Sequence, residues 1–316
     1  MSRADRARRS CLAVPGSSPR FLAKAPGLAA DEVFLDLEDA VAPDAKEEAR
    51  RHVVDALRSG DWSGKVRAVR INAVTTRWAY RDVIQVAEQA GQHLDVIVLP
   101  KVSGPPDVTW LDLLLSQVEQ EMGYPAGQIG IEAQIEDARG LAAVDAIAAA
   151  SPRLEALVFG PADFMASVGM RSLEIGSQPP GYAGADAFHY PLMRMLVAAR
   201  AHGLQAIDGP YAAIHDTDGL ARAATSVAAL GFDGKWVLHP GQIETVNAAF
   251  SPGQAEYDQA ELILEAYQHY TTVEKRGAAM LNGEMIDAAS RKLAQVAAAR
   301  GRAAGLVRTR RFEPPD

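Results

Sequence analysis

Residues 129–136 read IGIEAQIE and residues 156–163 read ALVFGPAD, and these two stretches decide the fold. In the first stretch the side chains alternate with a period of two, and both stretches are apolar runs that end in a polar residue, as β-strands do. The acids that close them, Glu136 and Asp163, lie 27 residues apart, about the length of one strand-plus-helix repeat. The spacing therefore predicts two neighbouring parallel strands with both acids at the same edge.

The same alternation of strand-like and helix-like segments extends through most of the chain. Between the strand-like runs lie segments with the 3.6-residue periodicity of amphipathic helices, three of which follow the candidate caps Asp44, Asp107 and Asp216. Eight strands alternating with helices predict a (β/α)₈ barrel, the TIM-barrel fold. The alternative, an open doubly wound sheet, lacks the GxGxxG and GxxxxGK[ST] motifs of its nucleotide-binding forms. The predicted strands are residues 11–15, 33–37, 66–71, 96–100, 129–135, 156–159, 204–207 and 236–239, and the helices are residues 45–57, 80–90, 111–122, 140–149, 191–202 and 220–230.

The alternation stops at about Ser251, so we expect the barrel to occupy residues 1–250 and a C-terminal helical lid or arm, with a tail, to occupy residues 251–316. Within the second part we expect a long amphipathic helix over residues 254–270, a charged turn and a second helix over residues 285–299.

Composition excludes several classes of partner. A formal net charge of −8 and a pI near 5.4 argue against general nucleic-acid binding, which usually needs a basic face. No apolar run reaches transmembrane length, and the run after the arginine-rich start is broken at Pro15 and Gly16, so we expect neither membrane insertion nor a signal peptide. Cys11 is the only cysteine, which agrees with a reducing compartment and predicts a cytoplasmic protein.

The predicted strands end in an unusually polar set of residues. In barrels of this kind the chemistry lies at the carboxyl ends of the strands, so these residues form one candidate site. Each alone has a simpler explanation: Lys101 or Asp208 could be a solvated loop charge, and Arg70 could merely hold Asp36 or Asp39 ionised. Glu136 and Asp163 could be two surface acids, but such a pair also suits Mg²⁺, which needs only one or two protein carboxylates. The set is Arg20, Lys24, Asp36, Glu38, Asp39, Arg70, Asn72, Lys101, Glu136, Asp163, Asp208 and His239.

Several segments are similar in order and spacing to one protein family. The chain resembles the citrate lyase β-subunit-like branch of the HpcH/HpaI aldolase superfamily from about Arg9 to about Ala299, and within it the subgroup that cleaves L-malyl-CoA and β-methylmalyl-CoA. The segments that carry the resemblance are Val14-Pro15-Gly16 with Arg20-Phe21-Leu22, Leu35-Asp36-Leu37-Glu38-Asp39-Ala40-Val41, Val69-Arg70-Ile71-Asn72, Leu99-Pro100-Lys101, Trp78-Ala79-Tyr80-Arg81-Asp82-Val83, Gln134-Ile135-Glu136, Phe159-Gly160-Pro161-Ala162-Asp163-Phe164, Gly234-Lys235-Trp236-Val237-Leu238-His239-Pro240 and Gly283-Glu284-Met285-Ile286-Asp287.

The resemblance assigns roles to individual residues. It implies that Glu136 and Asp163 bind Mg²⁺, with Mn²⁺ as a possible substitute, and that Arg70, Asp36 and Asp39 are catalytic. Asp287 falls at the position of an acid/base that the C-terminal arm of a neighbouring subunit delivers, which implies a homo-oligomer, a trimer or hexamer. The residues implied to meet the substrate or its CoA thioester are Arg20, Lys24, Arg70, Lys101, Ala162, Leu238 and His239.

The implied reaction is reversible cleavage of L-malyl-CoA to acetyl-CoA and glyoxylate, and of β-methylmalyl-CoA to propionyl-CoA and glyoxylate. Three alternatives remain open at this point: a (3S)-malyl-CoA thioesterase, a lyase acting on citramalyl-CoA, and a non-catalytic subunit that binds CoA esters. The Gly- and Pro-rich loop over residues 172–190 differs from the family pattern, so it leaves the acyl substrate undecided.

Overall fold

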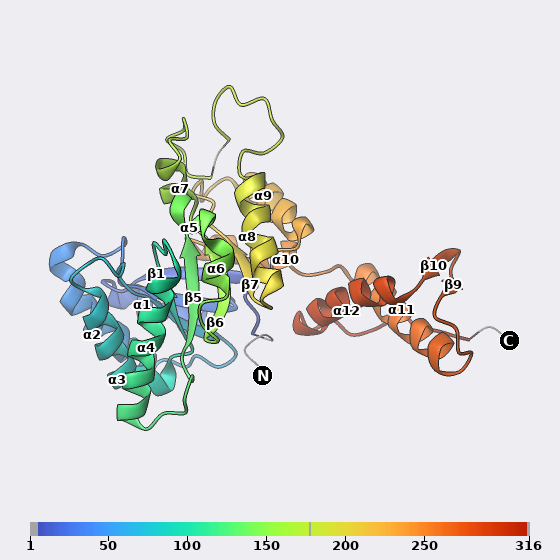
Figure 1. The fold of residues 1–316 in the computed structure, drawn as a ribbon, viewed down its shortest axis with the longest axis horizontal. Helices are drawn as coiled ribbons and strands as arrows, with labels where there is room; N and C mark the ends of the chain where they lie inside the picture. Colours follow the sequence, from blue (N-terminus) through green and yellow to red (C-terminus); the bar gives the residue numbers. More distant parts are fainter. Residues whose placement is uncertain (1–5, 177, 315–316) are drawn as a thin grey trace. The chain divides into compact units, whose positions relative to one another are not determined.

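The computed structural model describes residues 6–176 and 178–314, and its central feature is a closed barrel of eight parallel strands (Figure 1). The first strand pairs with both the second and the eighth, which closes the sheet. The predicted (β/α)₈ barrel is therefore confirmed. The strands are β1 (Ser10–Pro15), β2 (Glu32–Asp36), β3 (Val66–Arg70), β4 (Val96–Leu99), β5 (Gly130–Ile135), β6 (Leu154–Phe159), β7 (Gln205–Asp208) and β8 (Gly234–Val237).

Helices follow the strands and enclose the barrel wall (Figure 1). The α-helices up to residue 249 are α1 (Pro19–Lys24), α2 (Lys46–Ser59), α3 (Ala79–Ala90), α4 (Pro105–Met122), α5 (Ala138–Ala142), α6 (Val144–Ala148), α7 (Pro161–Ser167), α8 (His189–Ala201), α9 (Thr217–Leu230) and α10 (Ile243–Ala249). Short 3₁₀ turns are η2 (Ala25–Gly27), η3 (Pro43–Ala45), η4 (Gly91–His93) and η5 (Pro240–Gln242).

Only one of the three predicted caps has the predicted geometry. Asp216 caps α9 by accepting a hydrogen bond from the Gly219 backbone N–H. The helix predicted from residue 111 instead begins at Pro105, because a proline suits the first helical turn, so Asp107 lies inside that turn. Asp44 lies within η3 and makes no capping bond to α2. The helix predicted over residues 140–149 is two short helices, α5 and α6.

The barrel interior is apolar in the middle and charged at both ends. Its core takes alternate residues from seven of the eight strands, namely Cys11, Phe34, Val66, Ala68, Val96, Val98, Ala156, Val158, Ile207 and Trp236. β5 contributes polar residues to the same interior, because Glu132 is in register with Val98 and Gln134 with Val158. Glu136, two residues after Gln134, therefore follows on the same interior face at the carboxyl end of β5.

The amino end of the barrel is closed by Arg8, whose side chain is fully buried. Its Nε lies 2.8 Å from Glu32 Oε2 and 2.6 Å from Glu132 Oε1, and its Nη2 lies 2.6 Å from Glu155 Oε2. Its Nη1 donates to Gln205 Oε1 at 2.6 Å. Residues from β2, β5, β6 and β7 thus converge on one guanidinium.

The chain divides into two compact units, Met1–Asn247 and Ala248–Asp316. The second unit contains α11 (Gln254–Thr272), the hairpin of β9 (Ala279–Leu281) and β10 (Glu284–Ile286), and α12 (Ala288–Ala303). α11 and α12 pack through a small core that includes Tyr257 and Ala298. The prediction of a helix from residue 285 is wrong at its start, because Asn282 and Gly283 turn the chain into a hairpin with φ values of 51° and 86°.

Among residues 6–176 and 178–314, none of the helices combines the length and the apolar composition that crossing a bilayer demands.

Candidate active site

Glu136 lies at the carboxyl end of β5 and is almost fully buried, with 2% of its surface exposed. Its Oε1 accepts a hydrogen bond from the Lys101 backbone N–H at 2.6 Å, and its Oε2 accepts one from Gln134 Nε2 at 2.6 Å. Lys101 has a left-handed backbone, with φ of 53°, at the point where its N–H meets Glu136. Burial, then the nearby charges of Glu38 and Asp163, raise the pKa of Glu136 to about 8.

Gly160 allows Glu136 to lie against the end of β6. A Cβ at Gly160 would lie 2.4 Å from Glu136 Cβ and 2.5 Å from its Oε2, so only glycine fits between the two strand ends. Asp163 follows in the first turn of α7 and is half-buried. Its charge contributes to the raised pKa of Glu136, so the structure brings together the two acids that the sequence singled out.

Arg70 lies at the end of β3, in register with Asp36 on β2. Its Nε and Nη2 each donate to one Asp36 oxygen at 2.7 Å, and its Nη1 lies 3.1 Å from Glu38 Oε2. Burial alone would raise the pKa of Asp36, but Arg70 and the backbone N–H groups of Glu38 and Ala40 hold it below its usual value. Its two hydrogen bonds to Asp36 fix Arg70, and the Nη1–Glu38 contact is an ion pair without a hydrogen bond, so three of its five N–H groups stay uncommitted in these contacts.

The floor of the site is aromatic. The Arg70 guanidinium carbon lies 5.3 Å from the ring centre of Trp236 and 5.8 Å from that of Phe34, and the two rings are themselves 4.3 Å apart. A cation held above two buried rings is stabilised by their faces and is shielded from water on that side.

Lys101 and Asp39 form the outer edge of the charged group. Lys101 Nζ lies 2.7 Å from Glu38 Oε1 and 3.3 Å from Asp39 Oδ1. The Asp39 side chain is 62% exposed, whereas that of Glu38 is 5% exposed. Burial keeps the pKa of Glu38 above its usual value despite Arg70 and Lys101. Glu38 therefore connects the buried Arg70 to the half-buried Lys101.

The remaining predicted contacts lie where β1, β6 and β8 end. Arg20 and Lys24 are exposed on α1, which follows β1, and Leu238 and His239 follow β8, the neighbour of β1 in the barrel. His239 Nδ1 accepts a hydrogen bond from the Gly241 backbone N–H at 3.1 Å, so a neutral ring carries its proton on Nε2. Ala162 lies beside Asp163 in the first turn of α7.

Two members of the predicted set do not face the site. Asp208 follows the interior residue Ile207 and therefore points to the outer face of β7, where it forms an ion pair with Lys235 on the outer face of β8. Asn72 is buried, and its side-chain amide donates hydrogen bonds to the Asp82 carboxylate and to the Leu37 carbonyl. Because side chains alternate along a strand and Ile207 faces the interior, Asp208 must face outward, and it is excluded from the rim.

Gln134 and Gly160 are site residues that the sequence reasoning missed. Gln134 is 3% exposed and, besides its bond to Glu136, its Oε1 has no hydrogen-bond partner among the described residues. Gln134 lies two residues before Glu136, so the two side chains point to the same face of the strand. This period of two could have predicted Gln134 as a site residue.

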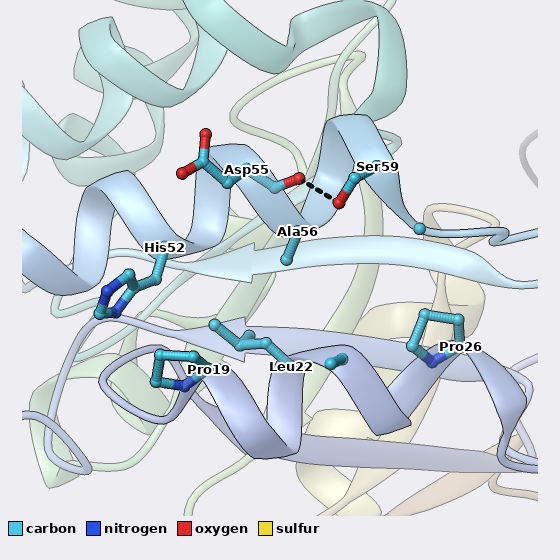
Figure 2. A pocket seen from close by; sticks show the side chains of 9 residues that line it. Pro19, Leu22, Pro26, His52, Asp55, Ala56 and Ser59 are labelled. Atoms are coloured by element: carbon cyan, nitrogen blue, oxygen red, sulfur yellow. Dashed lines mark hydrogen bonds between the residues drawn. The ribbon is translucent and has the colours of Figure 1, made fainter.

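A separate hollow of about 410 Å³ lies between α1 and α2, outside the barrel wall. Figure 2 shows Leu22 of α1 and Ala56 of α2 facing each other across it, with His52 at one end and Pro26 at the other. None of the residues implied to bind substrate or metal lines this hollow.

A divalent cation fits the site at Glu136 and Asp163. Glu136 is a buried acid crowded by two other carboxylates, a condition that a cation relieves, and each of its oxygens accepts only one hydrogen bond from a described residue. No group of three or more His, Cys, Asp or Glu residues suited to a metal occurs within residues 6–176 and 178–314. The donor set therefore fits a hard ion that takes its other ligands from water and substrate.

Asp287 lies in the second unit, as the N-cap of α12. Its Oδ1 accepts hydrogen bonds from the backbone N–H groups of Ala289 at 2.9 Å and Ser290 at 3.0 Å. Hydrogen bonds from Ser290 and then from Ala289 lower the pKa of the Asp287 carboxyl.

Comparison with known proteins gives consistent matches. The family model described as HpcH/HpaI aldolase/citrate lyase matches residues 9–240. An L-malyl-CoA/beta-methylmalyl-CoA lyase from Cereibacter sphaeroides is 39% identical over 290 residues, which cover 89% of this chain and 91% of the relative. A (3S)-malyl-CoA thioesterase from the same species is 37% identical over 279 residues, covering 88% and 89%. The structure of CitE from Mycobacterium tuberculosis in complex with magnesium, acetoacetate and coenzyme A has a TM-score of 0.73 and 30% identity, covering 96% of this chain and 100% of that chain.

Proposed function

The chain belongs to the HpcH/HpaI aldolase/citrate lyase family, and from this premise we propose that it is a Mg²⁺-dependent lyase that reversibly splits L-malyl-CoA into acetyl-CoA and glyoxylate. β-Methylmalyl-CoA, split into propionyl-CoA and glyoxylate, is the second proposed substrate. The observation that carries the proposal is the buried Glu136 beside Asp163 and Arg70 at the open carboxyl end of the barrel. This set combines two metal-binding carboxylates with one fixed positive charge.

Glu136 and Asp163 are the residues that would hold the metal. Bound there, Mg²⁺ would polarise the glyoxylate carbonyl and lower the pKa of the malyl hydroxyl. Gln134 and the Lys101 backbone N–H orient the Glu136 carboxylate for this task. Gly160 provides the space in which that carboxylate lies.

Arg70 supplies the positive charge that faces the reacting oxygen atoms. Asp36 accepts from two of its N–H groups and fixes the plane of the guanidinium, with Glu38 as a second ion-pair partner, so the other N–H groups can donate to oxygens on which negative charge develops. Both Asp36 oxygens already accept two hydrogen bonds, so we assign Asp36 an indirect role through Arg70. Asp39 acts through Lys101, which is near enough to the rim to meet a substrate carboxylate.

The CoA portion of the thioester would lie over the ends of β1 and β8. The exposed Arg20 and Lys24 can pair with its phosphates, and the Leu238–His239 turn can contact its acyl end. Ala162 would contact the substrate beside Asp163. The relative crystallised with coenzyme A, which is 30% identical, supports CoA-ester binding by this fold.

Asp287 is our candidate for moving the proton on the α-carbon of the thioester. Cleavage of the C–C bond leaves an enolate, and a carboxylic acid within reach completes the reaction by protonating it. We propose that Asp287 reaches the site of a neighbouring subunit, in a homotrimer or hexamer. We also propose that Mn²⁺ can replace Mg²⁺ and that the protein works in the cytoplasm, where the buried thiol of Cys11 would stay reduced.

One incubation distinguishes the lyase from its alternatives. Purified protein with Mg²⁺, glyoxylate and either acetyl-CoA or propionyl-CoA should form malyl-CoA or methylmalyl-CoA, identified by mass. With malyl-CoA as substrate, glyoxylate is the expected product. Free malate would instead favour the thioesterase, which the 37% identical relative keeps as the second candidate. No product of either kind from the pure chain would support the non-catalytic subunit.

The role of Asp287 is testable in mixed oligomers. Glu136→Ala and Asp287→Ala should each be inactive alone and should regain part of the activity when co-assembled, because some sites then pair an intact metal site with an intact arm. A proton-transfer residue contributes about a hundredfold to ten-thousandfold, so a minority of repaired sites is measurable. No recovery in verified mixed oligomers would place Asp287 in its own subunit's site or outside catalysis.

A further inference from the structure

Gln242 is a buried amide whose hydrogen bonds link the turn after β8 to the turn after β7. It is 1% exposed and ends η5. Its Oε1 accepts from the backbone N–H of Leu238 at 2.8 Å and from that of His239 at 3.3 Å, and its Nε2 donates to the Tyr211 carbonyl at 3.0 Å. Two donors on one side and an acceptor on the other fix the orientation of the amide.

The turn after β7, to which Gln242 is tied, is itself firmly held. Lys235 Nζ donates to the Gly209 carbonyl at 2.7 Å and pairs with Asp208. A Cβ at Gly209 would lie 2.2 Å from Pro161 Cδ and 2.5 Å from the Phe159 carbonyl, so the turn lies tightly against the end of β6. The turn that leads to Tyr211 is therefore held at Gly209 by β8 and by the end of β6.

The turn after β8, in contrast, faces outward. Leu238 is 42% exposed and His239 is also exposed, and the described side chain that fixes both of their backbone N–H groups is Gln242. Without that side chain the two N–H groups would have no partner within the turn, and the turn would adopt other conformations.

We propose that Gln242 is a positioning residue for thioester binding: its amide holds the Leu238–His239 turn at a fixed place relative to the β7 turn. This inference rests on the proposed function, in which that turn meets the CoA thioester. Glu136, Asp163 and Arg70 follow or end other strands, and none has a hydrogen bond to Gln242. The residue should therefore affect affinity for the thioester far more than metal binding or turnover.

Two variants test the inference in the full chain. Gln242→Met keeps the side-chain length and removes all three side-chain bonds, whereas Gln242→Glu keeps the acceptor for the β8 turn and replaces the N–H that reaches Tyr211 by an oxygen that cannot donate when ionised. Gln128→Met is the matched control, because Gln128 also donates its Nε2 to a backbone carbonyl, that of Gly91 at 2.8 Å, before the amino end of β5. KM and kcat for malyl-CoA, the calorimetric Kd of acetyl-CoA and of Mg²⁺, and the melting temperature are measured for each.

We expect KM and the acetyl-CoA Kd to rise about tenfold in Gln242→Met, the effect of roughly one to two buried hydrogen bonds, and less in Gln242→Glu. kcat and the Mg²⁺ Kd should change less than about threefold, and Gln128→Met should match the wild type. Unchanged KM in both Gln242 variants would overturn the inference, as would a parallel loss of kcat and Mg²⁺ affinity. If Gln242→Met does not fold, Gln242→Glu decides. A wild-type chain that neither binds acetyl-CoA nor cleaves malyl-CoA would overturn the proposed function itself.

Discussion

The two ends of the barrel each place one buried arginine among carboxylates, and they deal with the surplus negative charge differently. At the amino end Arg8 contacts three glutamates and has no exposed surface. At the carboxyl end Arg70 contacts Asp36 and Glu38 and lies near Glu136. Both ends contain more acids than one guanidinium can neutralise.

At the amino end a proton and a second arginine complete the balance. Arg6 donates to both oxygens of Glu155, at 3.0 and 3.1 Å. Glu32 Oε1 and Glu132 Oε2 have no hydrogen-bond donor among the described residues, and burial followed by the charge of Glu132 raises the pKa of Glu32 well above its usual value. Glu32 therefore holds its proton to a higher pH than an exposed glutamic acid does, and that proton can bridge the two carboxyl groups.

At the carboxyl end the surplus charge is left accessible. Asp163 is only half-buried, and Glu136 lies beside it with a raised pKa. The comparison teaches that the amino end is built for stability and the carboxyl end for a ligand. Substitutions at the two ends should therefore have different effects. Those at the carboxyl end should change activity, and those at the amino end should change stability.

Glu136→Ala gives the largest expected effect. It removes a proposed metal ligand and should lower kcat/KM by about a thousandfold or more, because the charge that develops during cleavage loses its stabilisation. The melting temperature should stay near that of the wild type, since a crowded acid is removed. Activity within about tenfold of the wild type would exclude Glu136 as a ligand.

Arg8→Met tests the amino end. Breaking a buried ion pair by removing one partner costs about 3–5 kcal/mol, so the free energy of unfolding should fall by that amount, measured by urea denaturation. Activity per folded molecule should be unchanged. Arg51→Met, on the exposed face of α2, is the control and should change stability by less than about 0.5 kcal/mol. Equal stability of the two variants would contradict the description of this end.

Gly160→Ala tests how closely Glu136 must be held. The added methyl group would overlap Glu136, so we expect the Mg²⁺ Kd to rise and kcat/KM to fall, each by about tenfold to a hundredfold. Gly27→Ala is a matched control, because a Cβ there meets no atom within 4 Å. If both alanine variants bind Mg²⁺ equally well, the close approach of β6 has no part in the site.

Glu32→Gln has the smallest expected effect, a change in the pH dependence of stability. An unfolded glutamic acid loses its proton near its ordinary pKa of 4.5, whereas burial raises the pKa of folded Glu32, which loses its proton only at a higher pH. The stabilisation is therefore complete below that pH and declines as the pH rises, by up to about 1.4 kcal/mol per pH unit. The amide of the variant carries no titrating proton, so the decline in stability that begins above about pH 4.5 should become shallower in the variant. The exposed Glu121→Gln should keep the wild-type slope.

The sequence predicted the barrel because its strands repeat with a regular spacing and end in polar residues, and it predicted Glu136 and Asp163 for the same reason. The prediction failed at Asp208, because consecutive residues of a strand point to opposite faces and Asp208 lies one residue after the interior Ile207. The hairpin around Asn282-Gly283 had a clear turn signal, which the neighbouring helical pattern obscured. The role of Arg8 could not be predicted, because its partners are brought together only by closure of the barrel.

The contacts of Arg8 also set the order in which the chain can complete its fold. Arg8 and Gln205 are 197 positions apart, and the pairing of Ser10 with Lys235 spans still more of the chain. During synthesis, therefore, β1 can pair with β8, and Arg8 with Gln205, only after β7 and β8 have been made. Contacts of such large sequence separation slow folding, so we expect barrel closure to be the late and rate-limiting event, with Arg8 as the last charge to be buried.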